Sequence, residues 1–570
     1  MDRHKLLGIF IISMFVFLVF GLFNLNIIGG RKYNKLSNSN CIRLIAQFGC
    51  RGSILDRQGE LIAGNRISYD VLILPQDLSD LDRILREVAG VLGVDPQQLR
   101  KTFKSGYLSS SVPVTIASNI DVKKAIALGE YKVNEPSIII QSKPLRYYPY
   151  STLAAHLLGY LNEIDRWRLT KLEDYGYKTK DIVGFGGVEE KYDYYLRQEE
   201  GGLSVEVNHQ GKFTRVLGFE LPKNGKDIQL TIDLNVQKIA ESALSGRKGC
   251  VIIMDPNNGE IIALASYPNF DPAIFVKRSG LSIAELFNNR DSPLVNRAIS
   301  AAYPPASVFK VILASAALEL KKVNPATSFS CPGFLLVGKR KFSCWDVHGE
   351  QNIVQAIAHS CDTFFYHTGL LTGAQNIYNY ALKFGLTKST NFELPYEVNG
   401  FIPSPLWRKL NRFQSWYDGD TANLSIGQGD CLVTPIQLVN MMAVFANQGY
   451  LCTPYVVKSI GGFDVSAHKR RLINMHLRKS TLDNVREGLR DVVTDAKGTG
   501  NVLSGLSVSV AGKTGTAQVP HGQTHAWFVG FFPFEKPKYT ICVFLENGGP
   551  GHAACTVAKE VIESMISQKL

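Results

Sequence analysis

The sequence predicts an α+β protein with an N-terminal transmembrane helix, a mixed α/β section, and a C-terminal domain whose central antiparallel sheet is flanked by helices. Three observations predict this: an apolar stretch at residues 6–28, a length of 570 residues, and a change of pattern near residue 227. A chain of this length is too long for one ordinary core and indicates two or three domains. Early strands, intervening helices and late strands favour a sheet assembled from both ends of the last section.

The apolar stretch at residues 6–28 is long enough to cross a membrane, because about 20 helical residues span the hydrocarbon core. The residues that follow it contain no convincing Ala-x-Ala cleavage pattern, so we expect an uncleaved signal anchor behind a short tail at residues 1–5. Basic residues lie on both sides of the stretch, at Arg3 and Lys5 and at Arg31 and Lys32, so they do not decide its orientation.

Two sections follow the anchor, at residues 29–226 and 227–570. In the first, strand and helix patterns alternate at residues 69–74 and 80–92. In the second, a strand at 227–233 precedes a helix with apolar residues between 236 and 244, and a Pro-Asn-Asn-Gly turn indicates a β-hairpin over 250–265. Three late strands are expected at 507–519, 524–532 and 539–546, and a final helix at 553–568.

The charge of the chain does not indicate a nucleic-acid binder. There are 62 basic and 50 acidic residues, for a net charge of +12, but the basic residues form only short groups and no long run or stripe. We therefore expect no nucleic-acid partner and at most a weak attraction to anionic lipid or wall polymer.

A candidate nucleophile lies where a helix is expected to begin. Two prolines at 304–305 precede Ser307 and Lys310, and an apolar run follows. Residues three apart share a helical face, so the hydroxyl and the amine should stand together. Serine needs a neighbouring base, and a desolvated lysine can serve as one. Taken alone, S-x-x-K is usually a chance pair on a protein surface.

Two further motifs change that interpretation. Lys513, Thr514, Gly515 and Thr516 form a K-T-G-T segment in a strand-like run at 508–519, and Ser360-Cys361-Asp362 lies between the two motifs. S-x-x-K, a middle S-x-N-type element and K-T-G in this order are the combined signature of penicillin-binding proteins and class A β-lactamases. We expect the helix, the loop and the edge strand to form three walls of one cleft.

With these motifs, the sequence resembles the elongation-type class B high-molecular-weight penicillin-binding proteins over nearly its whole length. The segments that carry the resemblance are 51–59, 146–149, 187–192, 426–429 and 525–531. The resemblance implies a non-catalytic pedestal of the dimerisation type at 29–226 and a transpeptidase domain at 227–570. It also implies a single-pass protein of the bacterial inner membrane, with the catalytic domain in the periplasm.

The resemblance implies a serine D-Ala-D-Ala transpeptidase that cross-links peptidoglycan stem peptides during elongation and shape maintenance, and that β-lactams inhibit. Ser307 would attack the D-Ala-D-Ala carbonyl, Lys310 would take its proton, and Ser360 would relay a proton to the leaving nitrogen. A side-chain amine from a neighbouring strand would resolve the acyl-enzyme. No cofactor is needed for this chemistry.

The K-T-G strand would bind the substrate. Lys513 and Thr514 offer a positive charge and a hydroxyl to the terminal carboxylate, with Gly515 beside them, and the backbone N–H groups of Ser307 and Thr516 would form the oxyanion hole. The middle motif departs from the general family pattern, which has Asn where this chain has Asp362. We take this aspartate as the elongation-type variant, neutralised by Lys310 and Lys513.

A Cys/His group indicates a structural zinc site. Cys331, Cys344, His348 and Cys361 lie within one 31-residue span, and a Cys3His set suits tetrahedral zinc. An extended loop would direct Cys361 away from the cleft, so that a metal could hold Ser360 in place. A Cys331–Cys344 disulfide and plain buried thiols remain alternatives, and Cys41 and Cys50 could also pair across a short loop.

Several alternative functions remain open from the sequence. A division-type class B transpeptidase, a serine β-lactamase, a β-lactam sensor and a structural scaffold share parts of the pattern. The long section before residue 227 and the retained anchor argue against a β-lactamase, and a single span argues against a sensor. By resemblance, the elongation type implies a multi-spanning glycan polymerase of the shape, elongation, division and sporulation family as partner.

Overall fold

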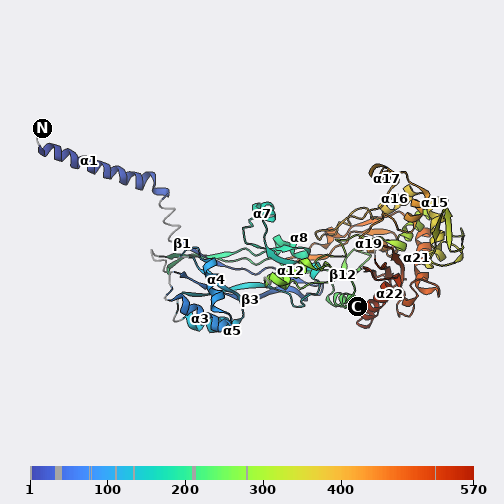
Figure 1. Cartoon of the computed structure of the whole chain (residues 1–570), viewed down its shortest axis with the longest axis horizontal. Coiled ribbons are helices and arrows are strands. Elements are labelled where there is room, and N and C mark those ends of the chain that lie inside the picture. The colour runs from blue at the N-terminus through green and yellow to red at the C-terminus, as the bar shows by residue number, and fades with distance from the viewer. Residues whose placement is uncertain are drawn as a thin grey trace. The chain divides into compact units, whose positions relative to one another are not determined.

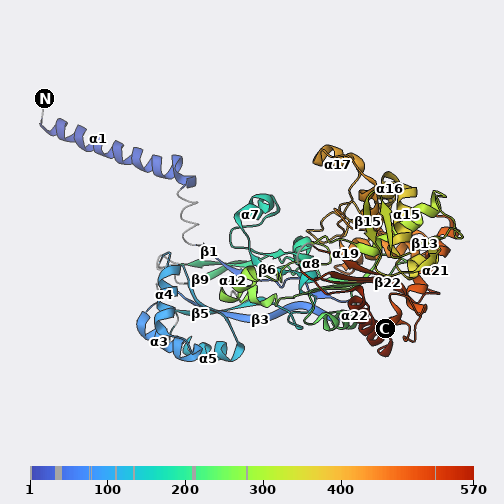
Figure 2. The ribbon, with the colours of Figure 1, turned by 45° about the vertical axis from the view of Figure 1, so that its right-hand side comes forward.

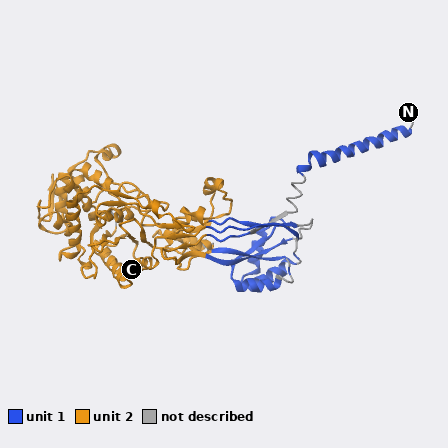
Figure 3. Cartoon of the chain, turned by 180° about the vertical axis from the view of Figure 1, so that it is seen from behind, with its two compact units in different colours: residues 1–51, 65–145, 197–225 blue, residues 52–64, 146–196, 226–570 orange. Residues whose placement is uncertain are grey.

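The computed structural model describes residues 3–32, 42–75, 78, 80–109, 112–132, 135, 137–207, 213–277, 280–519 and 522–569. The chain forms two compact units, which Figure 3 shows in different colours. Unit 1 comprises Met1–Arg51, Asn65–Leu145 and Arg197–Gly225, and unit 2 comprises Gly52–Gly64, Arg146–Leu196 and Lys226–Leu570. Unit 2 therefore includes two segments from before residue 227, in addition to the whole C-terminal section.

The N-terminal apolar stretch forms helix α1 (Arg3–Phe23), which continues in the π-helical turn η1 (Asn24–Ile28). Its apolar side chains are exposed throughout. Among the described residues, Arg3–Ile28 is long and apolar enough to cross a membrane, judged by length and composition. It is a candidate membrane anchor, in agreement with the pattern of the sequence.

The rest of unit 1 combines strands of two sheets with three helices. One sheet is antiparallel, with the order β1 (Ile42–Gln47), β8 (Gly201–Val207) and β9 (Phe213–Glu220). In the other, the long strand β3 (Leu61–Ile73) pairs with β4 (Val114–Ile120) and β5 (Ile138–Tyr147). The core lies between this sheet and three helices: α3 (Leu81–Leu92), α4 (Pro96–Gly106) and α5 (Val122–Lys132).

Helix α3 shows why the predicted helix at 80–92 forms where it does. The carboxylate of Asp80 accepts hydrogen bonds from the backbone N–H groups of Asp82 and Arg83, which caps the first turn. Gly93 ends the helix in the left-handed region, with φ of 72°. The apolar face between these ends is buried.

The centre of unit 2 is a five-stranded antiparallel sheet with the order β12-β11-β23-β22-β21. Its strands are β11 (Gly249–Met254), β12 (Ile261–Tyr267), β21 (Ala511–Ala517), β22 (His525–Phe532) and β23 (Tyr539–Leu545). The predicted hairpin is β11–β12, and the three predicted late strands complete the sheet, so the assembly from both ends of the section is confirmed. The K-T-G motif lies on the edge strand β21.

Helices cover both faces of this sheet (Figures 1 and 2). Helices α10 (Leu234–Leu244) and α22 (Gly551–Ser567) pack on the face that carries Val251 and Ile253. Helices α13 (Lys310–Glu319) and α19 (Pro435–Ala446) belong to the core that takes in the alternate residues Ile252 and Met254. Because successive side chains of a strand point to opposite faces, a strand that is apolar throughout can serve both cores.

The remaining elements of unit 2 surround this core or connect its parts. They are β2 (Ile54–Leu55), α6 (Ala155–Leu158), β6 (Tyr160–Glu163), α7 (Arg166–Leu172), η3 (Glu173–Tyr175), β7 (Ile182–Phe185), α8 (Gly187–Lys191), α9 (Asp193–Leu196), β10 (Ile228–Leu230), α11 (Ala273–Val276), α12 (Gly280–Asn288), η4 (Ala306–Phe309), β13 (Phe329–Cys331), β14 (Phe334–Val337), β15 (Arg340–Ser343), β16 (Gly349–Gln351), α14 (Ile353–Ala358), α15 (Asp362–Thr372), α16 (Ala374–Lys383), α17 (Pro405–Arg412), α18 (Asp418–Ser425), β17 (Tyr450–Cys452), β18 (Val457–Ile460), β19 (Phe463–Asp464), α20 (Ser466–Lys469), β20 (Leu472–Asn474), α21 (Lys479–Thr494) and η5 (Asn501–Leu503).

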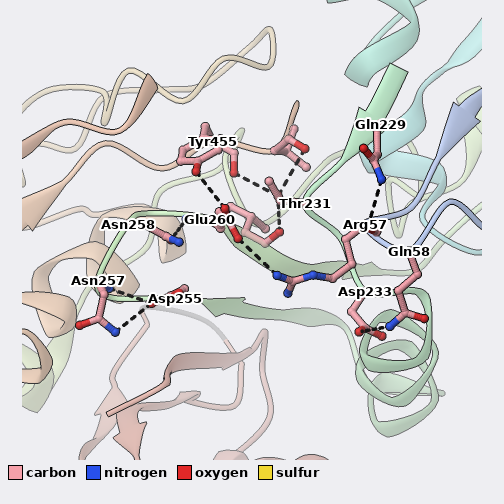
Figure 4. A network of polar contacts seen from close by, with 12 residues as sticks. Arg57, Gln58, Gln229, Thr231, Asp233, Asp255, Asn257, Asn258, Glu260 and Tyr455 are labelled. Atoms are coloured by element: carbon pink, nitrogen blue, oxygen red, sulfur yellow. Dashed lines mark hydrogen bonds and ion pairs between the residues drawn. The ribbon is translucent and has the colours of Figure 1, made fainter. Parts of the chain in front are cut away.

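A polar network ties the early segment Gly52–Gly64 into unit 2 (Figure 4). Gln58 donates from its amide to the Asp233 carboxylate at 3.1 Å, and the Arg57 guanidinium lies 3.4 Å from Glu260. The Gln229 amide donates to the backbone carbonyl of Arg57 at 3.1 Å. The motif at residues 51–59 therefore includes groups that hold this segment against the first strands and helix of the C-terminal section.

Candidate active site

Ser307 lies on the 3-10 turn η4, which leads directly into α13. The sequence predicted the first turn of an α-helix, and the structure corrects this to a tighter turn. Ala306 has a left-handed backbone with φ of 47°, and its N–H donates to the Gly427 carbonyl at 3.1 Å. The hydrogen bond to the loop at Gly427 therefore fixes the backbone where the chain enters the turn. The Ser307 side chain is half-buried, between fully buried neighbours.

Lys310 is joined to the middle motif. Its side chain is completely buried, and its Nζ lies 2.6 Å from Asp362 Oδ1. The same Nζ donates to Ser360 Oγ at 3.2 Å and to the Ser360 carbonyl at 2.8 Å. The structure thus brings the S-x-x-K turn and the Ser360–Asp362 segment into direct contact, across fifty residues of sequence.

Ser360 is held in an unusual backbone conformation. Its φ is 54°, in the left-handed region that a serine rarely adopts, and such strain is typical of functional sites. Two donors fix its carbonyl: Lys310, and the indole N–H of Trp345, which also donates to the His359 carbonyl at 3.1 Å. Sequence reasoning gave no role to Trp345, because nothing in the local pattern links it to Ser360.

Asp362 is the first residue of helix α15, and its carboxyl group is largely buried. Burial raises its pKa, and the positive charges of Lys310 and Lys513 act in the opposite direction without cancelling the effect. The two lysines expected to face this aspartate are therefore both near enough to act on it electrostatically.

Lys513 is the third charged group of the site. It lies on strand β21 and is fully buried. Burial holds its pKa well below the usual value for lysine, the charge of Lys310 lowers it further, and the charge of Asp362 acts against both. The pair of lysines and the aspartate form one electrostatic cluster.

Strand β21 packs directly against the Ser307 turn. A Cβ at Gly515 would lie 3.1 Å from Val308 Cγ2 and 3.2 Å from the Pro305 carbonyl, so the absence of a side chain permits this close approach. Thr514 is nearly buried, and its hydroxyl lies 2.6 Å from that of Thr499. The exposed Thr516 accepts a hydrogen bond from the Gly551 N–H at 2.9 Å. The Ser307 turn, the Ser360–Asp362 segment and the edge strand β21 therefore lie together.

The four Cys/His residues also converge. The ligand atoms of Cys331, Cys344, His348 and Cys361 all lie within 4.8 Å of one another. Nδ1 of His348 is 3.6 Å from Cys331 Sγ and 3.5 Å from Cys344 Sγ. All three cysteines are free, so the alternative of a Cys331–Cys344 disulfide is not what the structure contains.

The position of Cys361 differs from the prediction in one respect. Its own backbone is extended, but it is the N-cap residue of α15, so the helix begins at the next residue, and its Sγ accepts from the Phe364 N–H at 3.5 Å. A hydrogen bond from Cys361 lowers the pKa of Cys344, and the same bond, together with burial, raises the pKa of Cys361. Cys344 Sγ in turn accepts from the Asp362 N–H at 3.2 Å, so the Cys/His cluster directly contacts the segment that carries Ser360 and Asp362.

Other candidate residues are structural or lie outside the description. His525 is buried; its Nδ1 accepts from the Asn547 N–H at 2.9 Å, and burial lowers its pKa. The pairing considered for Cys50 involves Cys41, which lies outside the described residues. The remaining cysteines are buried and belong to the core: Cys250, Cys431, Cys452, Cys542 and Cys555.

The arrangement defines a class of enzyme. A serine followed by a lysine three residues on, a serine-containing loop hydrogen-bonded to that lysine, and a K-T-G edge strand are the parts of the penicillin-recognising serine enzymes. Two family models match the chain: "Penicillin binding protein transpeptidase domain" over residues 249–566, and "Penicillin-binding Protein dimerisation domain" over residues 47–230. The chain belongs to the penicillin-binding protein transpeptidase family.

Individual relatives agree with this assignment. The chain is 33% identical to the peptidoglycan D,D-transpeptidase MrdA of Acinetobacter baumannii, over 93% of this chain and 82% of the relative. It is 29% identical to MrdA of Escherichia coli K12, over 96% and 91%. Among solved structures, PBP2 of Helicobacter pylori in complex with MreC has a TM-score of 0.82 and 28% identity, over 92% of this chain and 99% of that one. PBP2 of Pseudomonas aeruginosa in complex with WCK 5153 has a TM-score of 0.70 and 29% identity, over 92% and 96%.

Proposed function

We propose that this chain is a peptidoglycan D,D-transpeptidase of the elongation type that acts through an acyl-enzyme on Ser307. The observation that carries the proposal is the contact of the buried Lys310 amine with Ser360 and Asp362, one helical turn from Ser307 and beside the K-T-G strand. The family and the MrdA relatives support the same reaction. The site residues and their roles are our assignment.

In the first half-reaction, Ser307 Oγ attacks the carbonyl of the penultimate D-Ala of a stem peptide. Lys310 accepts the hydroxyl proton, and Ser360, which shares a hydrogen bond with that amine, passes a proton to the leaving nitrogen. The Oγ–carbon bond forms, the peptide bond breaks, and terminal D-Ala leaves with the proton. The cleaved peptide bond supplies the energy, so no nucleotide or redox cofactor enters.

In the second half-reaction, a side-chain amine of a neighbouring stem peptide attacks the Ser307 ester. The new carbon–nitrogen bond forms, the ester bond breaks, and the proton of the amine returns to the Ser307 oxygen through the same groups. β-Lactams enter by the first half-reaction: their strained amide acylates Ser307, but the amine stays tethered and blocks the acceptor.

Substrate recognition is assigned to the edge strand. Lys513 and Thr514 bind the terminal carboxylate, Gly515 lets the strand approach the serine turn, and the backbone N–H groups of Ser307 and Thr516 receive the oxyanion. Asp362 keeps the Lys310 amine oriented toward Ser360.

The experiment that tests this function is a complementation assay in a strain whose growth and rod shape depend on this chain. Ser307→Ala should fail to restore shape. Ser315→Ala is the matched control, because Ser315 lies on α13, the helix that follows the Ser307 turn, and its hydroxyl donates to the Val311 carbonyl. Normal growth with the Ser307 variant would mean that the chain acts as a scaffold.

The buried position of Lys513 predicts a pH dependence. An ammonium is needed to bind the carboxylate, and the depressed pKa means that it loses its proton at a lower pH than an ordinary lysine. Acylation by benzylpenicillin should therefore slow as the pH rises through the alkaline range, measured as the second-order rate constant. Acylation by the methyl ester of benzylpenicillin, which lacks the carboxylate, should not slow in the same way. Parallel pH profiles for the two compounds would contradict this role.

Location and partners are proposed from the relatives and the anchor. Helix α1 would span the bacterial inner membrane once, with residues 1–5 in the cytoplasm and the part of the chain that follows the anchor in the periplasm, where the substrate lies. The dimerisation-domain match at 47–230 supports a non-catalytic pedestal at 29–226, ahead of the transpeptidase domain at 227–570. A relative is described in a complex with MreC. The solved structure of a peptidoglycan synthase complex, described as coordinating polymerization and crosslinking, supports a multi-spanning glycan polymerase as partner.

We also propose that Cys331, Cys344, His348 and Cys361 hold one structural zinc ion. Zn–S bonds of about 2.3 Å and Zn–N bonds of about 2.0 Å in a tetrahedron place sulfur and nitrogen about 3.5 Å apart. The separations of 3.6 and 3.5 Å between His348 Nδ1 and two of the sulfurs fit that value. When bound, the ion would fix the loop that carries Ser360 and Asp362, and it would take no part in the reaction.

This proposal predicts one equivalent of zinc in the purified protein, measured by inductively coupled plasma mass spectrometry. His348→Ala should lose the metal, lower the melting temperature and slow acylation, because the Ser360 loop is no longer tied from behind. Cys50→Ser, which changes an exposed cysteine outside the cluster, should keep the zinc. Full activity in wild-type protein without metal would exclude the proposed site.

A further inference from the structure

Thr499 lies beside the K-T-G strand and has no role in the mechanism above. Its hydroxyl oxygen is 2.6 Å from that of Thr514, a short hydrogen bond in which one hydroxyl must donate and the other accept. Its backbone N–H donates to the Ala358 carbonyl at 3.3 Å, two residues before Ser360. Thr499 therefore touches both the substrate-binding strand and the end of the helix that leads into the middle motif.

The loop that presents Thr499 is tightly fixed. A Cβ at Gly498 would lie 2.4 Å from the Val492 carbonyl, so the loop packs against the end of α21 where only glycine fits. The Gly500 N–H donates to that carbonyl at 2.9 Å, and the Asn501 amide donates to the carbonyls of Val493 and Asp495. A side chain on so constrained a backbone can hold a partner in one orientation.

The direction of the hydrogen bond between Thr499 and Thr514 decides whether the Thr514 hydroxyl can donate to a substrate carboxylate. A hydroxyl has one proton, so Thr514 can donate to a substrate carboxylate only if it does not donate to Thr499. If Thr499 donates instead, the Thr514 oxygen accepts that bond, and its own proton is free for the carboxylate. Hydrogen bonds to ionised acceptors are stronger than neutral ones, and linked hydroxyls strengthen one another.

We propose that Thr499 is a positioning residue for carboxylate recognition: it donates to Thr514 and so directs the Thr514 proton at the terminal carboxylate of the substrate or β-lactam. This inference rests on the proposed function, because it assigns that carboxylate to Thr514. It adds a specificity-determining residue that acts through Thr514 and does not itself contact the substrate.

The test compares acylation of detergent-solubilised full-length protein by benzylpenicillin and by its methyl ester. Thr499→Val keeps the shape but removes the donor. It should slow acylation by the carboxylate form roughly threefold to tenfold, in keeping with the loss of one hydrogen bond between neutral groups, and leave acylation by the ester nearly unchanged. Thr499→Ser keeps the donor and should restore the preference for the carboxylate. Thr494→Val, an exposed threonine on the neighbouring helix, is the matched control.

A double-mutant cycle separates action through Thr514 from direct contact. In a Thr514→Val background, Thr499→Val should have no further effect on the ratio of the two rates. An undiminished effect in that background would mean that Thr499 touches the substrate itself, and an equal slowing of both compounds would mean a structural role only; either result overturns the proposal. If no compound acylates wild-type protein, the proposed function fails first, and that outcome is distinguishable from both.

Discussion

Replacing Lys310 by alanine should slow acylation of Ser307 by benzylpenicillin roughly 10²–10⁴-fold, the range typical of a lost general base. The reason is structural as well as chemical. The Lys310 amine bridges Ser360 and Asp362 inside a fully buried site, so its removal also leaves the Asp362 carboxylate buried without its nearest counter-charge. Stopped-flow acylation with a fluorescent penicillin measures the effect.

Two comparisons make this result interpretable. Lys322→Ala changes an exposed lysine just beyond the end of the same helix and should acylate at the wild-type rate. Far-ultraviolet circular dichroism of Lys310→Ala should match wild type, which separates lost chemistry from lost folding. Wild-type acylation by a folded Lys310→Ala protein would show that another group takes the serine proton.

The largest expected loss of stability comes from a buried ion pair in unit 2. The Arg146 and Glu189 side chains are 1% and 0% exposed, and the Arg146 Nε donates to Glu189 Oε1 at 2.7 Å. Arg146 Nη1 also donates to the Gly52 carbonyl at 2.7 Å. Glu189→Ala leaves this guanidinium buried without its carboxylate, which should lower the free energy of unfolding by about 3–5 kcal/mol.

Urea denaturation followed by tryptophan fluorescence measures this change. Glu560→Ala is the control, because its partner Arg247 and the glutamate itself are both well exposed, and such pairs contribute below about 1 kcal/mol. A loss for Glu189→Ala no larger than the loss for Glu560→Ala would show that solvent or rearrangement compensates the buried charge.

Much of the fold could be predicted, because periodicity and turn chemistry act locally. The hairpin β11–β12 follows from two apolar runs around a Pro-Asn-Asn-Gly turn, and the edge strand β21 lies within the strand-like run expected at 508–519. The composition of the two units could not be predicted, because it depends on long-range pairing. Strand β10 pairs in parallel with β2, with Ile228 opposite Ile54, and this places an early segment in the later unit.

In the candidate site, too, features encoded by local sequence could be predicted, and features that depend on long-range contacts could not. Each of the three motifs is a short contiguous segment, so motif order and spacing identified the residues that lie around Lys310 and on β21. The 3-10 turn at Ser307 was missed, since it depends on a hydrogen bond from Ala306 to Gly427, more than a hundred residues away. Trp345 and Thr499 were missed for a related reason: their contacts with Ser360 and Thr514 arise only when separate loops pack together.

The most direct test of the account is mass spectrometry of the protein after reaction with benzylpenicillin. We expect one penicilloyl adduct, located by peptide mapping on Ser307 and absent from Ser307→Ala. An adduct on a different side chain, or rapid turnover of the drug with no adduct trapped, would contradict it.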